Sequence, residues 1–159
     1  IDGAWVPEPW ATRLVQEGGG KVLVDEATLW PQGKYVTTHL MVATKFLDKH
    51  PDVVKALLEA QVAANDFVNK NPAEAQQLAN SEIERITTKK LKDTVITAAW
   101  KNLTFTNDPV ASSLIAAAKS AQDIGLLKPV DNLAGIYDLG PLNEVLEAAG
   151  EPPVAGLSS

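Results

Sequence analysis

The sequence of 159 residues contains no cysteine, 2 histidines and 1 methionine. Without cysteine, a disulfide scaffold, a thiolate-bound zinc or iron–sulfur site and thiol catalysis are excluded for this chain. With so few histidines we expect no histidine-rich metal site. No apolar run reaches the roughly 18 residues that span a membrane, and no signal-peptide pattern occurs.

The charge balance is acidic, with 14 Lys and Arg against 20 Asp and Glu. A net charge of −6 argues against a broad surface for nucleic acid or anionic membrane. The sequence also lacks a phosphate-binding loop, a dinucleotide fingerprint, a zinc-protease motif and a nucleophile elbow. We therefore predict no catalytic residues, no cofactor and no metal.

Hydrophobic residues make up 45% of the chain, which is typical of a globular domain. The strand patterns lie near the start, over residues 1–6, 21–24 and 35–43. Between the first two, residues 8–17 have helical spacing, and Gly18 to Gly20 end that helix. These patterns predict a strand–helix–strand unit suited to a parallel sheet.

Helical patterns dominate the rest of the chain. Helices are predicted over residues 51–70, 72–86, 92–101, 109–124 and 141–149. Asp108 is expected to cap the fourth of these, with Pro109 at its first position. The composition is thus helix-heavy α/β, and a few short strands cannot cover so many helices. Because the chain also begins at Ile1 inside a strand pattern, we expect further strands upstream of this sequence.

Two polar or aromatic clusters are candidates for binding. Trp5 to Trp10 joins the end of a predicted strand to the start of a helix, which is the edge where open α/β sheets bind ligands. The two Trp rings would line an apolar ligand chain there, or alternatively fill the core. Thr37, Thr38 and His39 would face a ligand, or alternatively form a satisfied cluster on an edge strand.

Several motifs occur in the same order as in a known family. The most distinctive is the strand followed by the helix start Glu8-Pro9-Trp10. The others lie at residues 18–25, 29–31, 35–38, 45–58, 103–109 and 136–143. With this collinear set the chain resembles the substrate-binding proteins of nitrate/sulfonate/taurine ABC transporters, most closely the aliphatic sulfonate-binding branch.

The resemblance implies an α/β fold, namely the helix-rich C-terminal fragment of a two-lobed type II periplasmic-binding-protein fold. Residues 1–36 would form the end of lobe 2, and residues 37–150 the return crossing and the C-terminal part of lobe 1. Residues 151–159 would form a tail. The missing N-terminal half of the same protein would hold the first strands of lobe 1 and part of the ligand cleft.

The resemblance further implies the non-catalytic, extracytoplasmic solute-binding component of an ABC importer. It would bind a small anionic ligand (sulfonate, taurine or nitrate-like) in an interlobe cleft and deliver it to an ABC permease. It would do so without nucleic acid, as a periplasmic protein or a cell-surface lipoprotein. The implied ligand-binding residues are Trp5, Glu8, Trp10, Thr37, Thr38 and His39. Glu8 is a poor partner for an anion and is assigned to orientation or to a cationic part of the ligand.

Two other classes remain open. Relatives on the same fold include desulfinase-like enzymes and proteins of thiamine-precursor synthesis, whose chemistry needs Cys or His. The absence of cysteine argues against such an enzyme for this half of the protein. A free-standing helical interaction module is the third class, and the unpaired strand patterns count against it.

Overall fold

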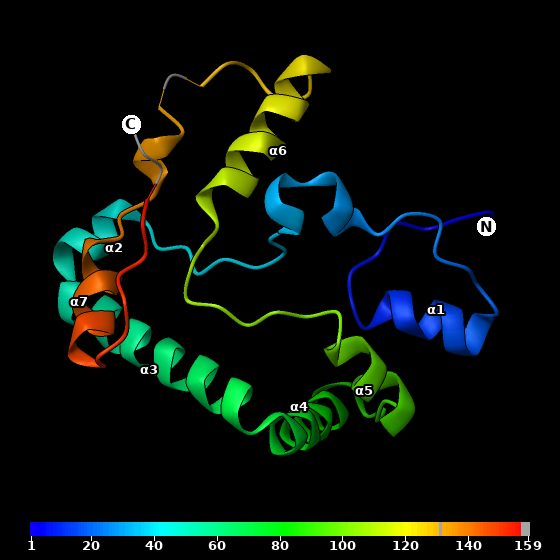
Figure 1. Cartoon of the computed structure of the whole chain (residues 1–159). Helices are drawn as coiled ribbons and strands as arrows, with labels where there is room; N and C mark the ends of the chain where they lie inside the picture. The colour runs from blue at the N-terminus through cyan, green and yellow to red at the C-terminus, as the bar shows by residue number, and fades with distance from the viewer. Residues whose placement is uncertain (131, 157–159) are drawn as a thin grey trace. The chain divides into compact units, whose positions relative to one another are not determined.

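The computed structural model describes residues 1–130 and 132–156, and the regular secondary structure of these residues is helical (Figure 1). The α-helices are α1 (Trp10–Gly18), α2 (Thr44–Lys49), α3 (Pro51–Lys70), α4 (Pro72–Thr87), α5 (Asp93–Trp100), α6 (Ala111–Asp123) and α7 (Gly140–Ala148). Short 3-10 helices are η1 (Glu26–Leu29), η2 (Pro31–Gly33) and η3 (Ala134–Ile136). Among the described residues, no helix is both long enough and apolar enough to cross a bilayer.

The helices follow the hydrophobic pattern of the sequence closely. The bounds of α3 are those predicted, and α4 begins at Pro72 as the Asn71-Pro72 break indicates. The C-terminal end of α1 is also as predicted, because Gly19 adopts φ 69° and its N–H donates to the carbonyl of Leu14. A left-handed residue at this position costs glycine little. Local periodicity and turn chemistry are sufficient to set these boundaries.

The predicted strands, in contrast, are absent from the described part of the chain. Residues 1–6, 21–24 and 35–43 are extended or irregular and belong to no sheet. A strand is held by hydrogen bonds to a neighbouring strand, so a β pattern without a partner cannot form one. Most apolar side chains of these segments stay in solvent, with Leu23 96% and Met41 86% exposed, while Val6 and Val36 are half-buried. The predicted helix-rich character of the chain is confirmed. The predicted sheet is not formed by residues 1–6, 21–24 and 35–43.

The start of α6 differs from the prediction. The helix begins at Ala111 rather than at Pro109. The Oδ1 atom of Asp108 accepts a hydrogen bond from the N–H of Val110, at 2.8 Å, and Val110 has φ 48°. The Asp108 side chain therefore closes an Asx turn with the N–H of Val110 instead of capping the first helical turn. The prediction missed this because both geometries suit an aspartate before proline.

The chain divides into two compact units. Unit 1 comprises Ile1–Val24 and Ala64–Thr106, and unit 2 comprises Asp25–Ala63 and Asn107–Ser159. Residue 131 and residues 157–159, which include the end of the predicted tail, lie outside the described residues.

In unit 1, α5 packs against both α1 and α4. Its buried face consists of Val95, Ile96 and Ala99. Asn80 of α4 is 1% exposed, and its side-chain amide pairs with both the N–H and the carbonyl of Leu91, at 2.9 and 3.0 Å. This pair of bonds satisfies the backbone just before α5 and so fixes how the chain enters that helix.

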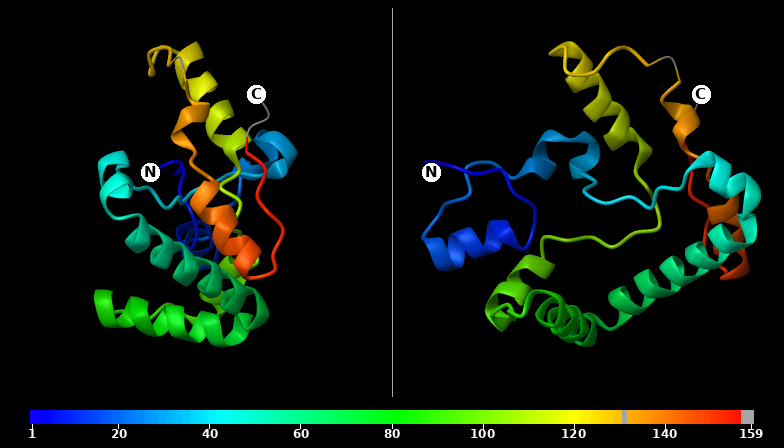
Figure 2. Two further views of the ribbon diagram at one scale, coloured as in Figure 1. Left: turned by 90° about the vertical axis from the view of Figure 1, so that its left-hand side faces the viewer. Right: turned by 180° about the vertical axis from the view of Figure 1, so that it is seen from behind.

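In unit 2, the core lies between α7 and the part of α3 that holds Leu58 and Val62, and the two helices lie close together in the views (Figures 1 and 2). The members of this core are Leu58, Val62, Leu139, Leu142, Val145, Leu146 and Val154. The side chain of Asn143 pairs with the N–H and the carbonyl of Val154, at 2.8 and 3.2 Å. The segment after α7 is thereby held against the core.

Candidate functional site

The start of α1 is organised around Glu8. Its carboxylate accepts hydrogen bonds from the N–H and the hydroxyl of Thr12, at 3.1 and 3.0 Å, and from the amide of Asn102, at 2.7 Å. Thr12 is buried. Glu8 thus satisfies an N–H of the first helical turns and joins α1 to the segment after α5. The predicted role of Glu8 at a ligand, in orientation or toward a cationic part of the ligand, stays a prediction.

The two tryptophans predicted at this helix start are both on the surface. Trp5 is 76% exposed and Trp10 54% exposed. The alternative in which both rings fill the core is therefore wrong for the described structure. Exposed indole rings offer a large apolar surface together with an N–H that can donate a hydrogen bond. The rings are available to an apolar group of a ligand.

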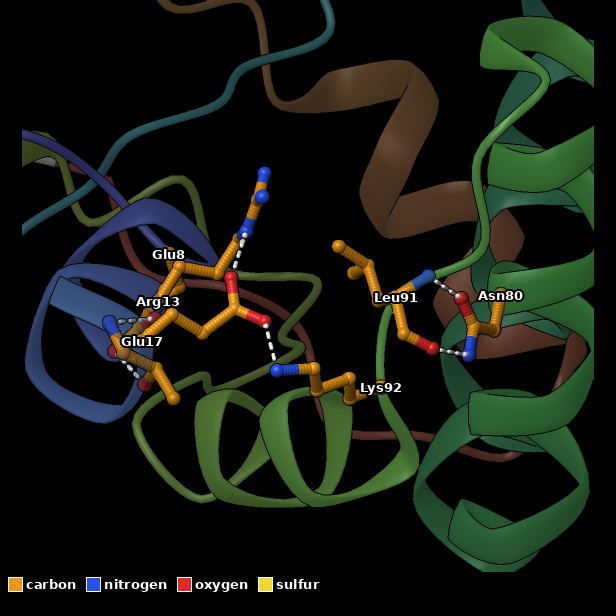
Figure 3. Close-up of polar contacts among 7 residues, drawn as sticks. Glu8, Arg13, Glu17, Asn80, Leu91 and Lys92 are labelled. Atoms are coloured by element: carbon orange, nitrogen blue, oxygen red, sulfur yellow. Dashed lines mark hydrogen bonds and ion pairs between the residues drawn. The ribbon is translucent and has the colours of Figure 1, made fainter.

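Next to Trp10 lies a cluster of charges that the sequence analysis did not predict. The guanidinium carbon of Arg13 lies 4.6 Å from the centroid of the Trp10 ring. Its Nε donates to Glu17 at 3.0 Å, and the other oxygen of Glu17 lies 3.1 Å from Nζ of Lys92 (Figure 3). The hydrogen bonds from Arg13, and then from Lys92, lower the pKa of Glu17 below its ordinary value of 4.5.

The second predicted cluster, Thr37 to His39, lies in unit 2. Thr37 and Thr38 are exposed, and His39 is half-buried. Nε2 of His39 lies 3.0 Å from the carbonyl oxygen of Pro109. A carbonyl only accepts, so Nε2 carries the hydrogen and donates it. Three residues before His39, the N–H of Val36 donates to the Ser113 hydroxyl at 3.4 Å. This segment is therefore attached to the start of α6.

Tyr137 is a neighbour of His39 that the site prediction did not include. The two ring centroids are 6.4 Å apart. The Tyr137 hydroxyl is buried and has no hydrogen-bond partner among the described residues. Burial raises the pKa of this hydroxyl, and the negative charge of Asp108 raises it further, so the hydroxyl is a neutral donor. A buried hydroxyl without a partner is unusual enough to need an explanation.

The six predicted residues thus form two groups. Trp5, Glu8 and Trp10 belong to unit 1 and share the start of α1, whereas Thr37, Thr38 and His39 belong to unit 2. The prediction missed Arg13, although its position three residues after Trp10 places the two side chains on one helix face. It also missed Tyr137, which is near His39 only in the fold. Among the described residues, no three His, Cys, Asp or Glu side chains form a group that could hold a metal.

The class of the protein follows from a comparison with protein families. The model of the NMT1-like family matches residues 1–83, which is more than half of the chain and includes all six predicted residues and Arg13. The chain therefore belongs to the NMT1-like family, the family of nitrate/sulfonate/taurine ABC substrate-binding proteins. No curated protein and no solved structure matches the chain significantly.

Membership has a general functional meaning. Proteins of this family bind small anionic ligands and work with an ABC permease. The family match supports the resemblance drawn from the sequence motifs at the level of the family, and the aliphatic sulfonate branch stays a prediction.

Proposed function

We propose that the protein is the extracytoplasmic solute-binding component of an ABC importer and that its ligand is a small aliphatic sulfonate. The observation that carries this proposal is the family match, because it spans the helix start with Trp5, Glu8 and Trp10. The exposed indole rings add to it. An alkyl tail needs apolar surface, and aromatic rings provide much of it at little cost in side-chain entropy.

The binding site in this proposal is the cleft of a two-lobed, type II α/β fold. The three extended segments support this, because their apolar, β-rich residues are exposed instead of paired. Apolar strand edges left in water are prone to pair with another strand. In the complete receptor these segments would join sheets, and closing of the two lobes on the ligand would be the state that the permease recognises.

The proposed location is the periplasm or the cell surface, with the protein anchored as a lipoprotein in the second case. An importer captures its solute outside the membrane, so this location follows from the proposed transport role. Fractionation of cells with an antibody against the protein tests it. Recovery in the cytosol would overturn the transport role as well.

Binding without catalysis is part of the proposal, and it separates a receptor from a desulfinase-like or thiamine-precursor enzyme. The full-length protein is incubated with stoichiometric butanesulfonate, dialysed and denatured, and the small molecules are identified by mass spectrometry. We expect butanesulfonate to be retained and recovered unchanged. Release of sulfite together with butan-1-ol, the products of hydrolysis of the carbon–sulfur bond by water, would instead establish a desulfinase-like enzyme.

A further inference from the structure

The only two arginines of the sequence, Arg13 and Arg85, have similar ion pairs but different surroundings. Arg13 pairs with Glu17 at 3.0 Å, and Arg85 pairs with Glu82 at 2.7 Å, each within about one helical turn. Arg13 also lies over the ring of the exposed Trp10, at 4.6 Å from its centroid. No aromatic ring lies under Arg85 in the described structure. The stacking of a guanidinium on an indole distinguishes Arg13 from an ordinary surface arginine.

The guanidinium of Arg13 is held in place from two directions. The Trp10 ring supports its face, and Glu17 accepts from Nε. Within the described residues the guanidinium makes its hydrogen bonds through Nε alone. Its outer nitrogens extend beyond the bond to Glu17, as Figure 3 shows. An arginine fixed in this way retains the N–H groups that pair with two oxygens of one anion.

The charges around Arg13 leave a surplus of positive charge. Glu17 is shared between Arg13 and Lys92, so this cluster holds two cations and one carboxylate. The nearest other carboxylate along the helix is Glu8, which already accepts three hydrogen bonds from Thr12 and Asn102. The carboxylates of Glu17 and Glu8 thus already accept hydrogen bonds from protein donors. The outer N–H groups of Arg13 make no hydrogen bond within the described residues.

We infer that Arg13 is the anchor for the charged head of the ligand, binding two oxygens of an organic sulfonate while Trp10 contacts the adjoining carbons. The inference rests on the proposed function, which it deepens by naming the cationic group. In the competing description, Arg13 and Glu17 form an exposed helical ion pair that only adds a little stability, as Arg85 and Glu82 do. The two descriptions differ in what a lysine at position 13 would do.

The test compares Arg13→Lys with Arg85→Lys in the full-length protein, titrated calorimetrically with methanesulfonate and with butanesulfonate. Lysine keeps the charge and the pairing with glutamate, but it loses the planar fork and the stacking on indole. We expect Arg13→Lys to weaken both ligands by the same factor, about 10- to 100-fold. The factor is the same because only the head group is affected. Arg85→Lys should bind as the wild type does.

The outcomes separate the inference from the proposed function. If the wild type binds neither anion, the proposed function fails, and the inference fails with it. If the wild type binds and Arg13→Lys binds equally well, or if both variants lose affinity equally, the inference alone is overturned.

A second measurement, on the wild-type protein, tests the inference if the Arg13→Lys variant does not fold. Phenylglyoxal modifies exposed arginines of the wild-type protein, and peptide mapping gives the rate at each. Butanesulfonate should protect Arg13 several-fold and leave Arg85 unchanged. Equal modification of Arg13 with and without the ligand would overturn the inference.

Discussion

At the scale of single residues, the acidic and the aromatic side chains at the start of α1 have different surroundings. The carboxylate of Glu8 accepts hydrogen bonds from Thr12 and Asn102 within the protein. Trp5 and Trp10 are not part of the core, since each residue is more than half exposed. Glu8 therefore positions the helix, and in the proposed function the aromatic side chains offer a surface to the ligand.

Substitution of the tryptophans separates these roles. Trp10 is exposed, whereas Trp100 is half-buried and lies 5.0 Å from the Phe105 ring. We expect Trp10→Ala to reduce the affinity of the full-length protein for butanesulfonate about tenfold, with little change in melting temperature. Trp100→Ala should instead destabilise the fold by about 1 to 3 kcal/mol and leave the affinity of the folded protein close to wild type. Calorimetric titration and thermal melting give the two values. Equal loss of affinity in two folded variants would remove Trp10 from the site.

The ion pairs of Glu17 predict a dependence on pH. Because the pKa of Glu17 in the folded chain lies below 4.5, its ion pairs stabilise the fold above that pH. The stabilisation is lost as the pH falls through the lowered pKa. The melting-temperature difference between wild type and Glu17→Gln should therefore be largest near neutral pH and should vanish in acid. In an NMR titration, Lys92→Met should move the Glu17 midpoint upward. A Glu17 midpoint at or above 4.5 in the wild type would contradict the geometry.

At the scale of elements, the helices could be predicted from the sequence because their determinants are local. The bounds of α3 follow from Pro51, the apolar stripe and the Asn71-Pro72 break. The extended segments could not be judged in the same way. Whether residues 21–24 form a strand depends on a partner strand, and local propensity does not reveal one. The same limit applies to the site, since Tyr137 approaches His39 across 98 positions of sequence, while Trp10 and Arg13 are one helical turn apart.

The connection between α4 and α5 depends on one buried side chain. Asn80 pairs with both backbone groups of Leu91, so Asn80→Ala leaves a buried N–H and carbonyl with reduced pairing. We expect a loss of about 1 to 3 kcal/mol in the free energy of unfolding, measured by urea denaturation. Asn69→Ala is the control, because the exposed Asn69 makes one hydrogen bond, to the Phe105 carbonyl. This substitution should lower the free energy of unfolding by less than about 1 kcal/mol. Equal costs would mean that Asn80 does not organise this connection.

The helix α7 depends on its apolar face. Leu146 is buried in the core that α7 forms with Leu58 and Val62 of α3. Leu146→Ala should cost about 2 to 5 kcal/mol, because it removes a fully buried side chain and leaves a cavity. Hydrogen exchange read by mass spectrometry should then show faster exchange in residues 140–148. Unchanged exchange there would mean that α7 is held by something other than this core.

At the scale of the whole molecule, family membership and the local structure support one another. The chain belongs to a family of solute-binding proteins, and the matched segment carries the exposed aromatic start of α1 and the Thr37–His39 segment. The division at residues 36 and 37 into lobe 2 and lobe 1 stays a prediction from the resemblance.

The most direct test of the account is a calorimetric titration of the full-length protein with butanesulfonate. The account predicts saturable binding at one site per chain in the micromolar range or tighter, with a negative heat-capacity change because the alkyl tail is buried. Methanesulfonate should bind more weakly, since it offers less tail to Trp10. The absence of any saturable heat with either sulfonate would contradict the central claim.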